Sequence, residues 1–161
     1  MLFKKTLTKE QALQKIKQYC SYQERCHSEV KQKLYSYGLY KRETEEIIAD
    51  IIENNYLNEE RFAVQFAGGK FRIKHWGRKK IQHELQQKGI STYIIKLALK
   101  ELNDPAYLKT LQTLASRKWN SLANEQYLNR QAKTHAYLLQ KGFEPALISQ
   151  AINQIRSGET K

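Results

Sequence analysis

Apolar residues recur at helical spacing along this chain, and segments of alternating apolar and polar residues are missing. Apolar positions three and four residues apart line one face of a helix, whereas a half-buried strand would show a period of two. Only seven glycines and two prolines interrupt 161 residues, and no low-complexity tract divides them. The pattern predicts a chain that is helical from end to end.

Three segments share one pattern when they are aligned on a glycine. In each, a leucine lies four residues before the glycine and an apolar residue follows it directly. A helix commonly ends on a glycine in the left-handed conformation, and the next apolar side chain folds back onto its last turn. The matching residues are Leu34, Gly38 and Leu39, then Leu85, Gly89 and Ile90, then Leu138, Gly142 and Phe143.

The helix expected after each glycine also repeats its register. Five apolar residues follow Gly89 and Gly142 at the same offsets, namely Ile94, Ile95, Ala98, Leu99 and Leu102, and Leu147, Ile148, Ala151, Ile152 and Ile155. After Gly38, the last three offsets hold isoleucines, but the first two hold Glu43 and Thr44. We therefore expect a more polar start to that helix in the first copy.

A further helix precedes each glycine-terminated one. Thr8 and Gln11 have the spacing of a capping box, and the second copy is expected to start after Asn58. In the third, Asp104 is predicted as the N-cap, with Pro105 at the first helical position.

The sequence thus predicts an all-α protein in which three tandem three-helix repeats stack into an elongated, curved molecule. The expected repeats are residues 8–57, 58–103 and 104–157. The third is expected to have a longer connection, or longer first and second helices.

The charge points to a polyanionic partner. Lys and Arg number 28 against 16 Asp and Glu, which leaves a net charge of +12. Such an excess favours nucleic acid, with a membrane surface as second candidate. No apolar stretch reaches the roughly 18–20 residues of a membrane span, and the N-terminal apolar run is too short for a signal peptide. We expect a cytoplasmic monomer that contacts no membrane.

The basic residues are densest in the second repeat, downstream of an acidic stretch at 43–60. We predict that they form a nucleic-acid or filament-binding site, since Lys and Arg contacts to phosphates give affinity through counterion release. Phe71 or Trp76 is a candidate for base stacking. The alternative is a solvated helix face with Trp76 as a core residue. The candidate residues are Lys70, Arg72, Lys74, Arg78, Lys79, Lys80 and Lys88.

Catalytic and metal-binding patterns do not emerge. Cys20 and Cys26 match no zinc motif and are expected to be buried thiols. Cys26 and His27 are neighbours, but adjacent residues on a helix point in different directions. No phosphate-cradling loop is present beyond the fragment at Gly68 and Gly69. We therefore expect no enzymatic activity, no metal and no cofactor.

Three segments resemble the RecX family, the bacterial regulators of the RecA recombinase. They are CSYQERCHSEVKQKLYSYGL (20–39), ENNYLNEERFA (53–63) and WGRKKIQHELQQKGI (76–90). The resemblance extends from about Ala12 to Leu102 and is weaker in the third repeat. The chain departs from the family by having Asn58 where Asp is common and Arg78 where Pro often follows the glycine.

The resemblance implies a specific function. RecX proteins consist of tandem three-helix repeats, bind the RecA filament on single-stranded DNA, and modulate RecA activity, usually by inhibition, in recombination, DNA repair and the SOS response. They have no known catalytic centre or cofactor. The competing hypothesis is a stand-alone nucleic-acid-binding module or helical transcriptional regulator.

Overall fold

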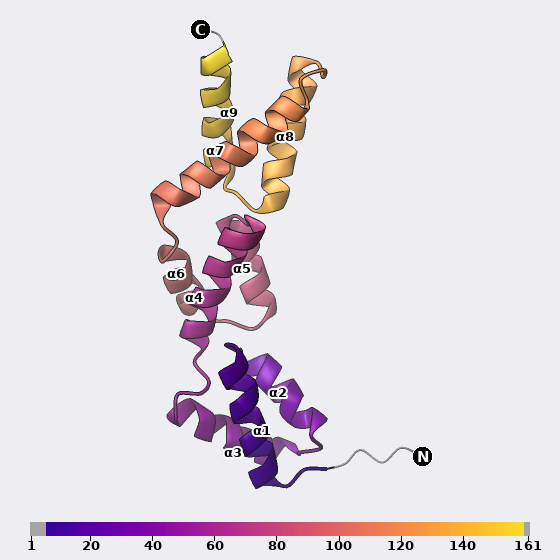
Figure 1. The fold of residues 1–161 in the computed structure, drawn as a ribbon, viewed down its shortest axis with the longest axis vertical. Coiled ribbons are helices and arrows are strands. Elements are labelled where there is room, and N and C mark those ends of the chain that lie inside the picture. The colour runs from indigo at the N-terminus through magenta and orange to yellow at the C-terminus, as the bar shows by residue number, and fades with distance from the viewer. Residues whose placement is uncertain (1–5, 160–161) are drawn as a thin grey trace, which may run out of the picture. The chain divides into compact units, whose positions relative to one another are not determined.

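The computed structural model describes residues 6–159, and within this range the chain is all-α, with nine α-helices, one π-helical segment and no strand. The first five residues, on which the expectation about a signal peptide partly rests, lie outside the described range. In chain order the elements are α1 (Lys9–Tyr22), α2 (His27–Ser36), α3 (Lys41–Glu53), α4 (Glu59–Gly69), η1 (Lys70–Lys74), α5 (Arg78–Gln87), α6 (Thr92–Lys100), α7 (Asp104–Ser121), α8 (Tyr127–Lys141) and α9 (Pro145–Glu159). The predicted all-helical repeat architecture is confirmed (Figure 1).

The helices belong to two compact units. Unit 1 comprises the described residues up to Gln65 together with Leu85–Ile95, and unit 2 comprises Phe66–Glu84 together with the described residues from Lys96 onward. The division passes through α4, α5 and α6, so the second repeat contributes residues to both units.

The three predicted glycine caps are confirmed. Gly38, Gly89 and Gly142 have φ angles of +87°, +79° and +99°, a region that other residues adopt only with strain. The leucine before each glycine is fully buried, and the apolar residue after it is at most 5% exposed. Ile90 and Phe143 also donate their N–H groups to the carbonyls of Leu85 and Leu138, which satisfies the ends of these helices.

Helices α1, α2 and α3 form the core of unit 1 (Figure 1). Its buried residues include Ala12, Ile16, Cys20, Val30, Leu34, Leu39, Ile47, Ile51 and Leu57. Thr44, predicted to start α3 with polar character, is fully buried, and its hydroxyl has no hydrogen-bond partner among the described residues. A threonine thus occupies the inward position that Ile95 and Ile148 hold in the other repeats, so the third helix of the first repeat faces inward in the same register.

Helices α7, α8 and α9 pack on one another within unit 2 (Figure 1). Helices α7 and α8 have 18 and 15 residues, against 14 and 10 in α1 and α2, so the third repeat is indeed larger because its first two helices are longer. Its largest buried side chains are Trp119, Tyr107 and Phe143, and the rings of Tyr107 and Phe143 lie 5.3 Å apart.

Two of the predicted helix starts are confirmed and one is wrong by a residue. Thr8 and Gln11 form the capping box, and the Asn58 side chain accepts the N–H of Arg61. In the third repeat the N-cap is Asn103, whose side-chain oxygen accepts the Ala106 N–H at 3.0 Å, rather than Asp104. Asp104 is already helical and its carboxylate instead pairs with Arg78.

Candidate nucleic-acid interface

The predicted basic segment begins in a π-helical turn. Residues Lys70–Lys74 form η1, which ends at His75 in the left-handed conformation, with φ of +57°. A π-helical turn and a positive φ at a non-glycine residue are both uncommon and recur at functional sites. The buried ring of Phe71 anchors the turn, with its centroid 5.6 Å from that of Tyr107.

Three of the predicted cations are exposed on this segment. Arg72, Lys74 and Lys79 make no side-chain hydrogen bond or ion pair to any residue between 6 and 159, and His75 is exposed beside them. Ile73 lies between Arg72 and Lys74 and is 77% exposed. We name the residues Arg72, Lys74, His75 and Lys79 the η1 surface. Its cations are free to contact a polyanion.

Two further predicted cations pack on Trp76. The ammonium groups of Lys70 and Lys80 lie 5.1 and 4.6 Å from the centroid of the indole ring. Trp76 in turn meets the ring of Phe66 edge-on, at 6.4 Å between centroids. Such cation–π contacts favour a fixed position for both lysines beside the η1 surface.

Arg78, also predicted as a contact residue, is held by partners inside unit 2. Its guanidinium lies 2.5 Å from the Asp104 carboxylate and 3.0 Å from that of Glu144, and 3.8 Å from the centroid of the Tyr107 ring. Tyr107 donates its hydroxyl to Glu144 and accepts the backbone N–H of Arg78. Burial and the Glu144 carboxylate raise the pKa of Tyr107 far above its ordinary value. The charge of Arg78 is thus already neutralised by carboxylates.

Replacing Arg78 with methionine is expected to lower the free energy of unfolding by about 2 kcal/mol, because a partly buried Glu144 carboxylate loses its cation. The exposed neighbour provides the control, since Lys79→Met should change it by less than about 0.5 kcal/mol. Urea unfolding followed by circular dichroism measures both. Equal values for the two variants would show that the Arg78 pairs contribute nothing specific.

The C-terminal end of α8 also reaches this segment. Gly77 donates its N–H to the Lys141 carbonyl at 2.7 Å, and Lys79 donates its N–H to that of Gly142 at 2.9 Å. The Lys141 ammonium donates to the Lys74 carbonyl at 2.7 Å. Burial, with the charges of Lys80 and Lys74, lowers the pKa of Lys141. Lys141 is therefore a cation of this region that the sequence pattern did not single out, since it lies far along the chain.

Lys88, the last predicted contact residue, belongs to unit 1, whereas the other six belong to unit 2. Its carbonyl accepts the hydroxyl of Ser28 at 3.3 Å within unit 1. The structure thus groups Lys70, Arg72, Lys74, Lys79 and Lys80 on one short segment, sets Arg78 apart in ion pairs, and assigns Lys88 to the other unit.

The two cysteines are buried, as predicted. Cys26 is fully buried and Cys20 is 5% exposed. Cys26 lies at the start of α2 and its Sγ donates to the Glu29 carboxylate at 3.1 Å. Burial raises the pKa of both thiols, in Cys20 to about 11. Neither environment provides the positive charge that activates a nucleophilic thiol.

Both thiols are expected to resist Ellman's reagent at pH 8 in the folded protein. A thiol with a pKa of about 11 is thiolate in only about one molecule in a thousand at that pH, and burial blocks the reagent. Two thiols should react within minutes once urea unfolds the chain. Rapid reaction of the folded protein would contradict the burial of these residues.

Metal-binding clusters and membrane-spanning helices are missing from the part of the chain that the structure describes. No three His, Cys, Asp or Glu residues between 6 and 159 lie close enough together to hold a metal ion. In the same range, no helix combines the length and the apolar character that crossing a bilayer requires.

Comparison with known proteins agrees with the repeat architecture. Residues 58–99 match the family model described as "RecX, second three-helix domain", and residues 106–152 match "RecX, third three-helix domain". Together the two matches cover more than half of the chain. The third repeat, where the sequence resemblance is weaker, is therefore matched as well as the second.

Proteins named "Regulatory protein RecX" are similar over most of this chain. The one from Lactobacillus johnsonii is 28% identical over 94% of this chain and 56% of its own length. The one from Prosthecochloris aestuarii is also 28% identical, over 89% of this chain and 93% of its own. The chain spans only about half the length of several such relatives.

A solved structure shows the same fold. The crystal structure of RecX from Lactobacillus salivarius superposes with a TM-score of 0.84 and 28% identity, covering 92% of this chain and 96% of that one. The fold, the two family matches and these relatives agree with one another. The chain belongs to the RecX family.

Proposed function

We propose that this protein regulates the RecA recombinase by binding the RecA filament on single-stranded DNA, and that it lowers RecA activity in recombination and DNA repair. The support from comparison is its membership of the RecX family and the name "Regulatory protein RecX" that its relatives carry. In this proposal it acts in the cytoplasm as a monomer, without a cofactor and without catalysing a reaction.

The observation that carries the proposal is the η1 surface. Arg72, Lys74 and Lys79 present charges that no carboxylate between residues 6 and 159 neutralises. Cations of this kind bind phosphates without regard to base sequence, which suits a regulator that must act wherever a filament forms. Lys70 and Lys80, held on Trp76, extend the positive potential along the same segment.

The exposed Ile73 adds an apolar contact within this positive surface. A surface that carries both charge and an apolar side chain suits a nucleoprotein filament, which offers phosphates and protein to one ligand. We propose that phosphates meet the cations while Ile73 meets a RecA subunit.

Fluorescence anisotropy tests the proposal directly. A labelled oligo(dT), bare or coated with RecA in the presence of a slowly hydrolysed ATP analogue, is titrated with the full chain. We expect tighter binding to the coated strand than to the bare strand or to RecA without DNA. Equal or weaker binding to the coated strand would contradict the proposal. Preferential binding to one duplex sequence without RecA would instead favour a transcriptional regulator.

A further inference from the structure

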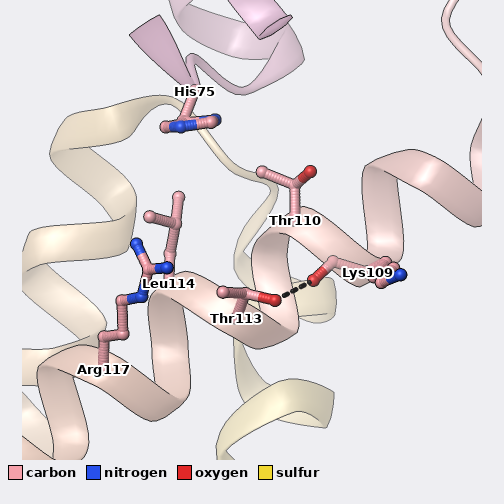
Figure 2. Close-up of a pocket in the computed structure, with 6 residues that line it drawn as sticks. All are labelled: His75, Lys109, Thr110, Thr113, Leu114 and Arg117. Atoms are coloured by element: carbon pink, nitrogen blue, oxygen red, sulfur yellow. Dashed lines mark hydrogen bonds between the residues drawn. The ribbon is translucent and has the colours of Figure 1, made fainter. Parts of the chain in front are cut away.

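Unit 2 contains a small pocket between the end of η1 and helix α7 (Figure 2). His75 projects toward α7 from one side, and residues on a single face of α7 form the other. The volume of about 180 Å³ is about six times the ~30 Å³ that a water molecule occupies in the liquid, enough for a tetrahedral oxyanion. The residues that line it are His75, Lys109, Thr110, Thr113, Leu114 and Arg117.

The lining combines cations and hydrogen-bond donors without a carboxylate. Lys109 and Arg117 are positively charged, and the imidazole of His75 offers an N–H donor. None of these three side chains has a hydrogen-bond or ion-pair partner among residues 6–159. Two cations on adjoining turns of a helix repel each other, and an anion between them removes that repulsion.

The hydroxyl groups of the pocket have different roles. Thr113 donates its hydroxyl to the Lys109 carbonyl at 2.9 Å, so its donor is occupied within the helix (Figure 2). Thr110 makes no such bond between residues 6 and 159, and its hydroxyl is available to a ligand. The pocket can therefore surround an anion with a guanidinium, an ammonium, an imidazole and one hydroxyl.

The backbone fixes His75 in this position. Its φ of +57° is costly for a residue with a β-carbon. The turn is held by the hydrogen bond from the His75 N–H to the Phe71 carbonyl, at 3.0 Å, and by that from Trp76 to Lys70, at 3.3 Å. Backbone strain of this kind is often found where a side chain must be aimed at a ligand.

We propose that this pocket binds one phosphate group. Arg117 supplies a two-pronged contact to two phosphate oxygens, Lys109 adds charge, and Thr110 and His75 donate the remaining hydrogen bonds. The pocket is separate from the cations of the η1 surface except for His75, which belongs to both. As a seat for a backbone phosphodiester it rests on the proposed function and names a second contact to the strand, whereas as a seat for a free or terminal phosphate it is independent of RecA.

The test uses the full chain without RecA, so that its outcome is separate from that of the proposed function. The His75 ring signals, assigned by comparison with His75→Gln, are followed by NMR during titration with inorganic phosphate. The same titration is made with oligo(dT) carrying a 5′-hydroxyl and with oligo(dT) carrying a 5′-phosphate. Saturable shifts with the hydroxyl-ended strand identify a phosphodiester as the ligand, and shifts only with inorganic phosphate or the phosphorylated strand identify a terminal phosphate.

Matched variants show whether the pocket itself is responsible. Arg117→Gln should weaken phosphate binding about tenfold, as expected for loss of a charge-assisted contact. Lys109→Gln should weaken it severalfold. Lys118→Gln removes the same charge one residue away, from a side chain that lies over the Tyr137 ring and outside the pocket, and should change binding by less than about twofold. Unmoved His75 signals, or equal losses in Arg117→Gln and Lys118→Gln, would overturn the proposal.

Discussion

Replacing Gly77 with alanine is expected to lower the free energy of unfolding by about 3 kcal/mol. A β-carbon on Gly77 would lie 2.3 Å from the Gly142 carbonyl carbon and 2.4 Å from the Phe143 nitrogen. These are backbone atoms, which cannot move aside as the end of a flexible side chain can. The substitution would also strain the hydrogen bond from the Gly77 N–H to the Lys141 carbonyl. Urea unfolding of the full chain, followed by circular dichroism, measures the loss.

Gly69→Ala is the matched control for Gly77→Ala. Gly69 has ordinary right-handed helical angles, and a β-carbon there would meet no atom within 4 Å. Alanine should therefore stabilise the chain by about 0.5–1 kcal/mol, because it reduces the freedom of the unfolded state. The two Gly→Ala changes are expected to have opposite signs. A Gly77→Ala variant as stable as the wild-type chain would show that this close approach of backbones is wrong.

Reversing the exposed charges of the η1 surface should abolish most of the binding to the RecA filament. The triple variant Arg72→Glu, Lys74→Glu and Lys79→Glu removes up to three phosphate contacts and adds three repelling charges. We expect about a 100-fold loss of affinity and a decrease of about 2 in the slope of log K against log salt, at about 0.7 for each single-strand phosphate contact. Anisotropy titrations at several salt concentrations give both numbers.

A second triple variant separates position from net charge. Lys31, Lys96 and Lys100 are exposed and lie outside the basic segment, so reversing them to glutamate changes the net charge by the same amount. Filament affinity should fall less than about fivefold in this control, through the general field of the protein. Equal losses in the two variants would mean that filament binding depends on overall charge, and the η1 surface would lose its role.

The helix ends could be predicted from the sequence because their causes are local. Gly38, Gly89 and Gly142 each end a helix in the left-handed conformation, and this requires only a glycine and the apolar residue that follows. The N-cap of α7 was wrong by one residue because Asn103 and Asp104 are both good caps. Only the backbone of the folded chain decides between them.

The site was less predictable because it depends on contacts between distant residues. Arg78 and Lys79 are adjacent basic residues, yet the first is held by Asp104 and Glu144 while the second is exposed. Nothing near Arg78 in the sequence reveals those partners. The phosphate pocket likewise joins His75 to Lys109 and Arg117, more than thirty residues further on. Such clusters arise from packing within unit 2, which charge density along the chain does not report.

The stability and binding predictions depend on different parts of unit 2. Gly77 and Arg78 connect the start of α5 with the end of α8 and with Tyr107, and they should affect unfolding. Arg72, Lys74 and Lys79 make no such contacts within residues 6–159, and they should affect binding with little change in stability. A variant set that includes both groups therefore separates folding from function within one short segment.

The most direct test of the proposed regulation is the ATPase activity of RecA on single-stranded DNA with this protein titrated in. We predict a saturable fall in ATP hydrolysis as the full chain is added, and little fall with the Arg72→Glu, Lys74→Glu and Lys79→Glu variant at the same concentrations. ATP hydrolysis that stays constant or rises, at concentrations where the protein saturates the filament, would contradict its assignment as a negative regulator of RecA.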